Sequence, residues 1–268
     1  MKRTTYILFG MILSGLLVII VGVIVVASLG EQRSANELFL GGKTITKELP
    51  PFRAVVVSQM NGGTTDQILR FDNCKFQVSS SETGKNVFSC PKDAMEYLSL
   101  KVQNDTLYLA FDYPADKLPE HMKGDRYIWI SENIWGLQIA QNVDYIKMYD
   151  PLLRLGLQGL AQDTLSVDVA TSVLVDSCRL ASLSVCEARE LNLQSGEIDK
   201  LYLDLDGIRN WKVDTEKLHL NTEYLTGSNS NVSLQKGECK QMFWIPKKED
   251  SQLRVTLTER SCIKVDDK

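Results

Sequence analysis

The sequence predicts an all-β chain, in which a β-helix, or solenoid, forms the ectodomain and one N-terminal transmembrane helix carries it. Three observations predict this fold class. Short alternating apolar groups recur about every 18 residues from Leu165 onward, and the first 30 residues contain a long uncharged apolar stretch. Elsewhere a sustained 3.6-residue period is scarce, so helices are not expected to dominate the chain.

The N-terminal stretch 4–30 carries no charge, and about 20 apolar residues are enough to span a bilayer core. Lys2 and Arg3 precede it and Glu31 follows it, and this excess of positive charge places the N-terminus in the cytoplasm. We therefore predict a cytoplasmic stub (1–5), a transmembrane helix (6–29), a linker (30–47), an ectodomain (48–262) and a tail (263–268).

A cleaved signal peptide is the alternative interpretation of this stretch. Residues 25–27, Val-Val-Ala, are compatible with a cleavage site. The apolar run is longer than the 7–15 residues typical of a signal peptide, which favours a retained signal-anchor. With cleavage, the protein would instead be secreted or held at the cell surface.

Several short strands precede the repeat. Pro50-Pro51 ends any helix before a valine-rich strand, and Asn104-Asp105 supplies a turn between two alternating strands. Alternation also predicts strands within 66–80 and 125–140. Two segments, 116–122 and 151–162, are the candidates for helical turns outside the membrane.

The repeat consists of two interleaved series of apolar groups. The first series starts at Leu165, Leu183, Leu201 and Leu218, with gaps of 18, 18 and 17 residues. The second starts at Val173, Leu191 and Trp211, with gaps of 18 and 20. This regularity predicts a coil whose turns each add stacked strands, with apolar side chains pointing inward. An antiparallel sandwich also has short strands, but such a constant period over four successive groups is not typical of it.

Three segments resemble the GIN-type head domain of auto-transporter adhesins, a family of bacterial envelope proteins. They are LPPFRAVVVSQ, DAMEYLSLKVQNDTLYLAF and the Ser-Gly-punctuated repeats LQSGEIDKLYLDLDG and YLTGSNSNVSLQKG. The resemblance covers residues 49–237. It implies a β-solenoid with a surface or envelope role, here at the bacterial inner membrane with a periplasmic ectodomain. It supplies no catalytic residues.

Signatures of enzymes are mostly missing from the sequence. His121 and His219 have no ligand partner at metal spacing, and no CxxC, GxSxG or phosphate-cradling loop occurs. We therefore expect no catalytic, metal or cofactor residues and no cofactor. Paired carboxylates are the remaining enzymatic possibility, since Asp168 and Asp204 would meet on one face if the rungs stack in phase.

The six cysteines would meet an oxidising environment outside the membrane. Pairs that are close in sequence, Cys74 with Cys90 and Cys239 with Cys262, are the disulfides we expect. For Cys178 and Cys186, a disulfide and buried free thiols remain equally open.

The predicted function is non-enzymatic: envelope binding, adhesion or scaffolding. Trp129, Trp135 and Trp211 are candidates for an aromatic ligand face, and Trp244 for a cap over the last rung. The expected partners are the membrane and an extended polysaccharide or an envelope protein. Nucleic acid is not expected, because the net charge is −4 and no dense basic cluster occurs. A carbohydrate-active enzyme and a tethered sensor subunit are the alternatives.

Overall fold

The computed structural model describes residues 11, 13–23, 36–60, 68–112, 118–131, 133–149, 153–234 and 238–257. The chain divides into two units, residues 1–37 and residues 38–268. In the first unit residues 11 and 13–23 are helical, and the rest of the predicted span 6–29 lies outside the described residues. Among the residues described, the structure contains no helix with the length and apolarity needed to cross a membrane.

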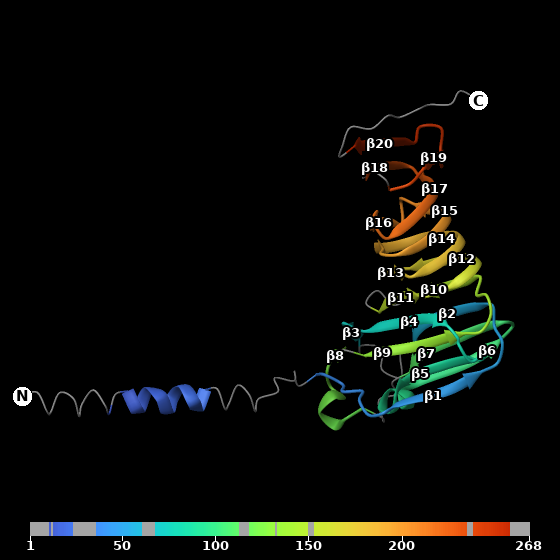
Figure 1. Ribbon diagram of the computed structural model, residues 1–268. Coiled ribbons are helices and arrows are strands. Elements are labelled where there is room, and N and C mark those ends of the chain that lie inside the picture. Colours follow the sequence, from blue (N-terminus) through green and yellow to red (C-terminus); the bar gives the residue numbers. More distant parts are fainter. Residues whose placement is uncertain are drawn as a thin grey trace, which may run out of the picture. The chain divides into compact units, whose positions relative to one another are not determined.

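The second unit is built of short parallel strands stacked into a coil (Figure 1). One side of the coil, which we call face 1, contains β2 (Ala54–Met60), β10 (Tyr145–Met148), β12 (Ala161–Val169), the first half of β14 (Cys178–Leu193), β15 (Gly196–Asp204), β17 (Leu218–Gly227) and β19 (Gln241–Pro246). The other side, face 2, contains β4 (Lys75–Ser80), β11 (Arg154–Gln158), β13 (Ser172–Asp176), the second half of β14 and β16 (Ile208–Val213). A further parallel pair joins β18 (Asn229–Leu234) to β20 (Gln252–Leu257).

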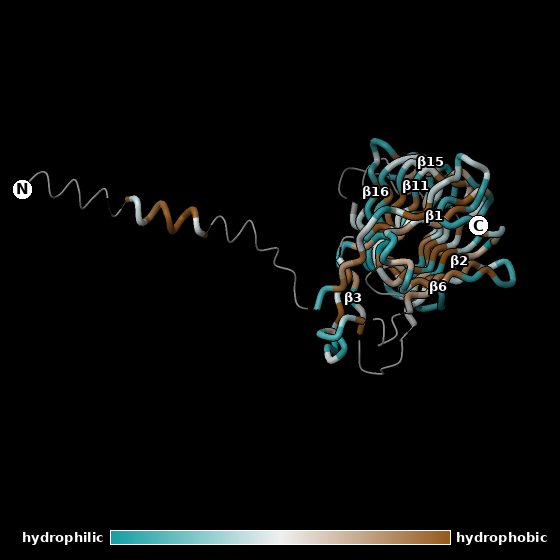
Figure 2. The backbone as a smooth tube through the Cα atoms, turned by 90° about the horizontal axis from the view of Figure 1, so that it is seen from below, coloured by the Kyte–Doolittle hydropathy of each residue, from teal (hydrophilic) through white to brown (hydrophobic). Residues whose placement is uncertain are grey.

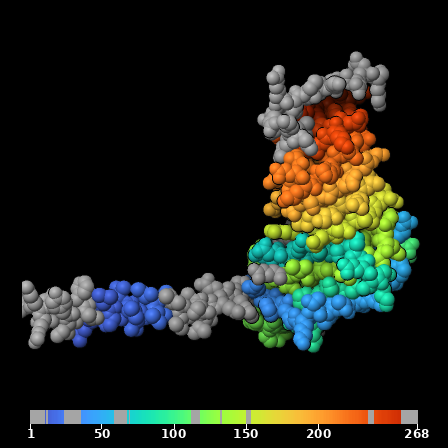
Figure 3. All heavy atoms as spheres, in the orientation of Figure 1, coloured from blue at the N-terminus to red at the C-terminus, as the bar shows by residue number. Residues whose placement is uncertain are grey.

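The first apolar series forms one column inside face 1. Leu165 is paired in register with Leu183, and Leu183 with Leu201. Their exposures are 2%, 0% and 0%. In the second series, Val173, Leu191 and Trp211 are paired in the same way on face 2. The predicted coil is therefore confirmed, and the parallel pairing of these strands rules out an antiparallel sandwich. Figure 3 shows the turns following one another in sequence order.

The fourth member of the first series is a correction. Leu218 is paired with Gly196, and the residue in register with Leu201 is Glu223. Leu218 follows Gly196 by 22 residues, whereas Gly196 follows Cys178 by 18, because the turns before β16 and before β17 each add two residues to this coil turn. Leu218 therefore lies five residues before the position that is in register with Leu201. Glu223 occupies that position in place of the expected leucine.

Two other local predictions were wrong. The predicted helical segment 151–162 contains β11 and the start of β12, because Leu153, Leu155 and Leu157 are buried at a period of two rather than 3.6. Trp244 is not in a separate cap: it lies on β19, which adds a further parallel rung to β17. In the predicted segment 116–122, the described residues contain the short 3-10 turn η2 (Glu120–Met122).

Antiparallel strands close the lower end of the coil. They are β1 (Thr44–Leu49), β5 (Asn86–Pro91) and β6 (Leu98–Gln103), with the 3-10 turn η1 (Lys92–Tyr97) between β5 and β6. β6 pairs with β7 (Thr106–Asp112) and β5 pairs with β9 (Ile134–Ile139). β7 and β9 are themselves the lowest parallel rungs, because β7 pairs parallel with β2 and β9 with β4. Asn104 and Asp105, which both have positive φ, form the predicted turn between β6 and β7. A two-stranded parallel sheet, β3 (Ile68–Asp72) and β8 (Tyr127–Ser131), lies at the side of the coil (Figure 2).

One corner of the coil requires glycine. Gly196 has a φ of 118°, and a Cβ at this position would collide with the backbone of Cys178 on the rung below. The close approach of two successive rungs therefore depends on a residue without a side chain.

Truncating the central leucine of the face 1 column tests the stack. We expect Leu183→Ala to lower the free energy of unfolding by about 2–5 kcal/mol, because the cavity would be enclosed by rungs on both sides. Ser184→Ala, at the neighbouring outward position, should change it by less than about 0.5 kcal/mol. Urea denaturation of both variants measures the difference, and equal effects would contradict the inward column.

Candidate functional site

Three aromatic side chains form a ladder on the outer surface of face 1. Tyr202, Tyr224 and Phe243 occupy equivalent positions on β15, β17 and β19, where in-register pairing places them directly above one another. Their ring centroids are 4.6 and 5.2 Å apart and the rings are nearly parallel. Tyr202 and Phe243 are 36% and 45% exposed. We call these three residues the aromatic ladder.

Hydroxyl-bearing side chains continue the same outward column toward the base. Ser184 is paired with Tyr202, Ser166 with Ser184, and Tyr145 with Ser166. The stacked rings of the aromatic ladder cover one another, but on β14 the neighbour of Tyr202 is only a serine. One face of the Tyr202 ring is therefore not stacked on an aromatic neighbour in this column.

Charged side chains lie beside the aromatic ladder in lysine–carboxylate pairs. Lys247 Nζ lies 2.6 Å from Asp204 Oδ1 and 2.9 Å from Asp206 Oδ2. The pKa of Asp206 is lowered to about 2, first by the hydrogen bond from the Ser228 backbone N–H and then by the Lys247 ammonium. The carboxylates of Asp204 and Asp206 are therefore both paired with the Lys247 ammonium.

The two carboxylates weighed as a catalytic pair are not neighbours. Asp168 is on β12 and Asp204 on β15, with β14 between them. Asp168 Oδ2 lies 2.8 Å from Lys147 Nζ and accepts a hydrogen bond from the Tyr145 hydroxyl. Each aspartate is thus held by its own lysine, and the separation of two rungs is about 10 Å.

The three tryptophans predicted as ligand-face residues lie in different environments. Trp129, on β8, is 41% exposed, whereas Trp135 is 1% exposed. Trp135 stacks on Phe111 and meets the edge of Phe71, so it belongs to the core of the base. Trp211 is partly buried, and its Nε1–H donates to Glu238 Oε1 at 3.2 Å.

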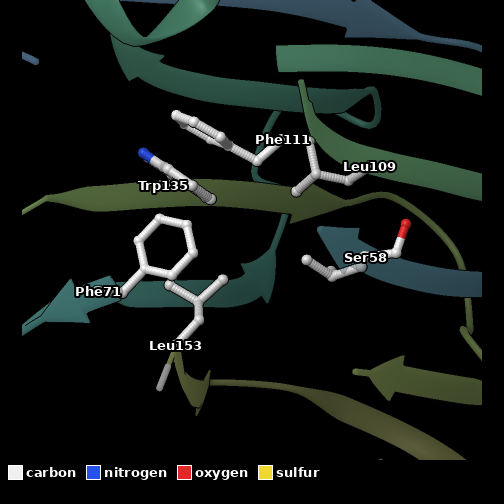
Figure 4. A pocket seen from close by; sticks show the side chains of 7 residues that line it. Ser58, Phe71, Leu109, Phe111, Trp135 and Leu153 are labelled. Carbon is white, nitrogen blue, oxygen red and sulfur yellow. The ribbon is translucent and has the colours of Figure 1, made fainter. Parts of the chain in front are cut away.

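A small cavity lies beside Trp135 (Figure 4). Its volume is about 10 Å³, and its lining residues are Val57, Ser58, Phe71, Leu109, Phe111, Trp135 and Leu153. A cavity of this size holds at most about one water molecule, and a stable water needs several polar partners. The lining is almost wholly apolar, so this cavity does not provide a small-molecule site.

Two glutamates lie inside the upper rungs. Glu223, in the inward column between Leu201 and Met242, is fully buried, and Glu238 is 4% exposed. Cys239 Sγ lies 3.6 Å from Glu223 Oε2, whereas Glu223 Oε1 has no hydrogen-bond partner. The pKa of Glu223 is raised to about 8, first by burial and then by the Glu238 carboxylate. We call Glu223 and Glu238 the buried carboxyl pair.

The cysteines that the structure describes form no disulfide. Cys74 and Cys90 are separate buried thiols, so the bond expected between them is not formed. Cys74 Sγ donates instead to the Ile130 carbonyl, which anchors it to β8. Cys239 is a free thiol here and Cys262 lies outside the described residues, so that pairing stays a prediction. Cys178 is a buried thiol and Cys186 an exposed one.

The histidines occupy ordinary positions. His121 lies in η2, and His219 points outward on β17, between the buried Leu218 and Leu220. Within the described ranges, no cluster of three or more His, Cys, Asp or Glu side chains could hold a metal ion.

Comparison with known proteins gives a likeness of fold. No family model matches the sequence, and no curated protein matches it. A candidate adhesin from Bacteroides fragilis superposes with a TM-score of 0.52 at 14% identity, over 82% of this chain and 98% of its own. A candidate lipid-binding protein from Parabacteroides distasonis gives a TM-score of 0.44 at 8% identity, over 82% of this chain and 99% of its own. A candidate adhesin from the same species gives a TM-score of 0.32 at 12% identity, over 83% of this chain and 97% of its own. The chain shares its fold with the first of these proteins.

Sequence reasoning missed the aromatic ladder and the buried carboxyl pair. A signal for the ladder was available, because each of its residues directly precedes an inward residue: Tyr202 before Leu203, Tyr224 before Leu225 and Phe243 before Trp244. No comparable signal existed for Glu223, because the longer coil turn before β17 changes which residue points inward.

The buried carboxyl pair predicts a pH dependence of stability. Between pH 4.5 and about 8 the folded chain keeps a proton on Glu223 that the unfolded chain has released. The free energy of unfolding should therefore fall as pH rises through this window, by up to about 1.4 kcal/mol per pH unit.

Thermal unfolding between pH 5 and 9 measures this dependence. We expect Glu223→Gln, which cannot ionise, to flatten the decline in Tm, and Glu197→Gln at an exposed position of β15 to leave it unchanged. A decline that persists in Glu223→Gln would show that Glu223 is not the titrating group.

Proposed function

We propose that this chain is an envelope protein that binds an extended polysaccharide without catalysis, using the aromatic ladder on face 1. The observation that carries the proposal is the in-register stacking of Tyr202, Tyr224 and Phe243 on an exposed surface. Tyrosine side chains combine an apolar ring with a hydroxyl, which suits sugars that have apolar faces and polar edges. The hydroxyls of Ser166 and Ser184 extend this polar surface along the same column.

The repeat of the coil favours an extended ligand over a small one. Successive rungs present equivalent positions about 4.8 Å apart, so a linear polymer can meet several of them in turn. Binding of this kind gains affinity from many weak contacts rather than from one enclosed pocket. An adhesin-like role of the GIN type is part of this proposal, and the shared fold with the Bacteroides fragilis protein supports it.

The proposal includes tethering at the bacterial inner membrane. Residues 6–29 would serve as the signal-anchor, with the N-terminus in the cytoplasm and the coil in the periplasm. The uncharged apolar sequence of this segment and the preceding Lys2 and Arg3 support the assignment. Such a position would keep the coil facing envelope polymers.

The carbohydrate-active enzyme is the less favoured candidate. Asp168 and Asp204 lie on rungs that are not adjacent, and each is paired with a lysine. Asp204 and Asp206 do lie close together, but they share the Lys247 ammonium, and Glu223 and Glu238 are buried away from any substrate.

Removing the ends of the aromatic ladder tests the binding function. We expect the double variant Tyr202→Ala/Phe243→Ala to weaken polysaccharide binding about tenfold or more, because exposed aromatic anchors commonly contribute over 1 kcal/mol each. Tyr108→Ala, at an exposed position of β7 in the base, is the matched control and should bind as the unmodified chain does.

The measurement is retention of the full chain by a panel of immobilised bacterial polysaccharides, followed by titration with the retained polymer. Equal affinities for the double variant and the control would contradict a role for the aromatic ladder. Turnover of any polymer would favour the enzyme instead.

A further inference from the structure

A second cluster of exposed aromatic side chains lies at the base of the coil, away from the aromatic ladder. Tyr127 and Trp129, both on β8, are 38% and 41% exposed, and Phe39 is 61% exposed. The intervening residue Ile128 is fully buried, so Tyr127 and Trp129 point outward together from the β3–β8 sheet. Leu38 and Leu40 are buried on either side of Phe39, which turns its ring outward as well.

Two arginines accompany these rings. The Arg70 and Arg126 guanidinium carbons each lie 5.6 Å from the centroid of the Tyr127 ring. Arg70, on β3, is paired in register with Trp129. Among the described residues, no ion pair to either guanidinium is present. We call Phe39, Arg70, Arg126, Tyr127 and Trp129 the basal patch.

The basal patch lies where the chain enters the folded unit. Leu38 N–H donates to the Trp129 carbonyl at 2.7 Å, so the first residue of this unit is hydrogen-bonded to the strand that carries the patch. Eight residues, 30–37, separate Leu38 from the end of the proposed anchor at residue 29. A chain of that length spans at most about 29 Å even when fully extended.

We propose that the basal patch docks on the phospholipid surface of the membrane in which the chain is anchored. This inference rests on the anchoring included in the proposed function. Tryptophan and tyrosine side chains favour the headgroup layer, where the ring is shielded and the polar atom stays hydrated. Arginine guanidinium groups bind phosphate oxygens in bidentate geometry, and those of Arg70 and Arg126 lie beside the same ring.

The short tether strengthens such docking. A weak surface contact becomes effective when the two partners are held together, because the connecting chain sets a high local concentration. Asp72 lies on the same outward face as Arg70, so the aromatic side chains, rather than net charge, are expected to dominate the contact.

Fluorescence quenching by brominated lipids tests the docking on the full chain. The protein is reconstituted into phosphatidylcholine–phosphatidylglycerol vesicles whose acyl chains are either brominated or unmodified, and the vesicles are first floated on a density gradient. Of the four tryptophans, Trp129 is the one in the basal patch, Trp135 is buried in the base, and Trp211 and Trp244 lie on upper rungs. We expect brominated lipid to quench the emission.

Two matched variants assign the quenching to a residue. Trp129→Phe should abolish most of it, whereas Trp244→Phe should leave the quenched intensity unchanged. Tyr127→Ser keeps all four tryptophans and should reduce the quenching of Trp129 by weakening the contact. Circular dichroism checks that each variant retains its strands.

The outcomes separate the docking from the function on which it rests. A chain that floats with the vesicles but shows no quenching, or the same quenching in Trp129→Phe, would overturn the docking and leave the anchor in place. A chain that does not float would overturn the anchor and the docking together. Polysaccharide binding through the aromatic ladder is measured separately and is not changed by either result.

Discussion

An aliphatic side chain that points into this coil is covered chiefly by the equivalent side chains on the rungs above and below it. Leu183 is buried because Leu165 and Leu201 lie in register on either side. A single rung cannot bury its own apolar face, so each rung depends on its neighbours for stability. The constant register also fixes the outer surface, because side chains alternate along a strand and every inward column has an outward neighbour.

The aromatic ladder follows directly from this constraint. Leu203 and Leu225 are held in register inside face 1, so the residues before them, Tyr202 and Tyr224, must stack outside it. The long strand β14 contributes to both faces and keeps the two sets of rungs in step. A binding surface on such a scaffold is ordered by the core and needs no flexible loop.

The rungs differ in how apolar and how well buried their inward side chains are. Most inward positions are aliphatic, but β17 brings Glu223 into the column, with Glu238 close by. A buried carboxyl group is tolerated only when it is neutral, because desolvation strongly disfavours the charged form. On β19, the inward Met242 and Trp244 are only partly buried. The upper rungs are thus less well covered than the middle of the coil.

Much of the fold could be predicted because the period of the apolar residues is itself the physical cause of the stacking. The positions of Leu165, Leu183, Leu201, Val173 and Leu191 followed from spacing alone. The prediction failed at Leu218, where four added residues in one coil turn shifted the register, and at 151–162, where short alternation resembled a helical turn. Trp135 could not be assigned to the core from sequence, because its environment is formed by Phe71 and Phe111, far away along the chain.

Methyl contacts between the stacked leucines test the central claim most directly. In a sample with isotope-labelled leucine methyl groups, nuclear Overhauser effects should connect Leu165 with Leu183 and Leu183 with Leu201. The effect between Leu165 and Leu201 should be weak or missing, because two rungs separate them by about 10 Å. Strong contacts between Leu165 and Leu201, or none from either residue to Leu183, would contradict the stacked coil.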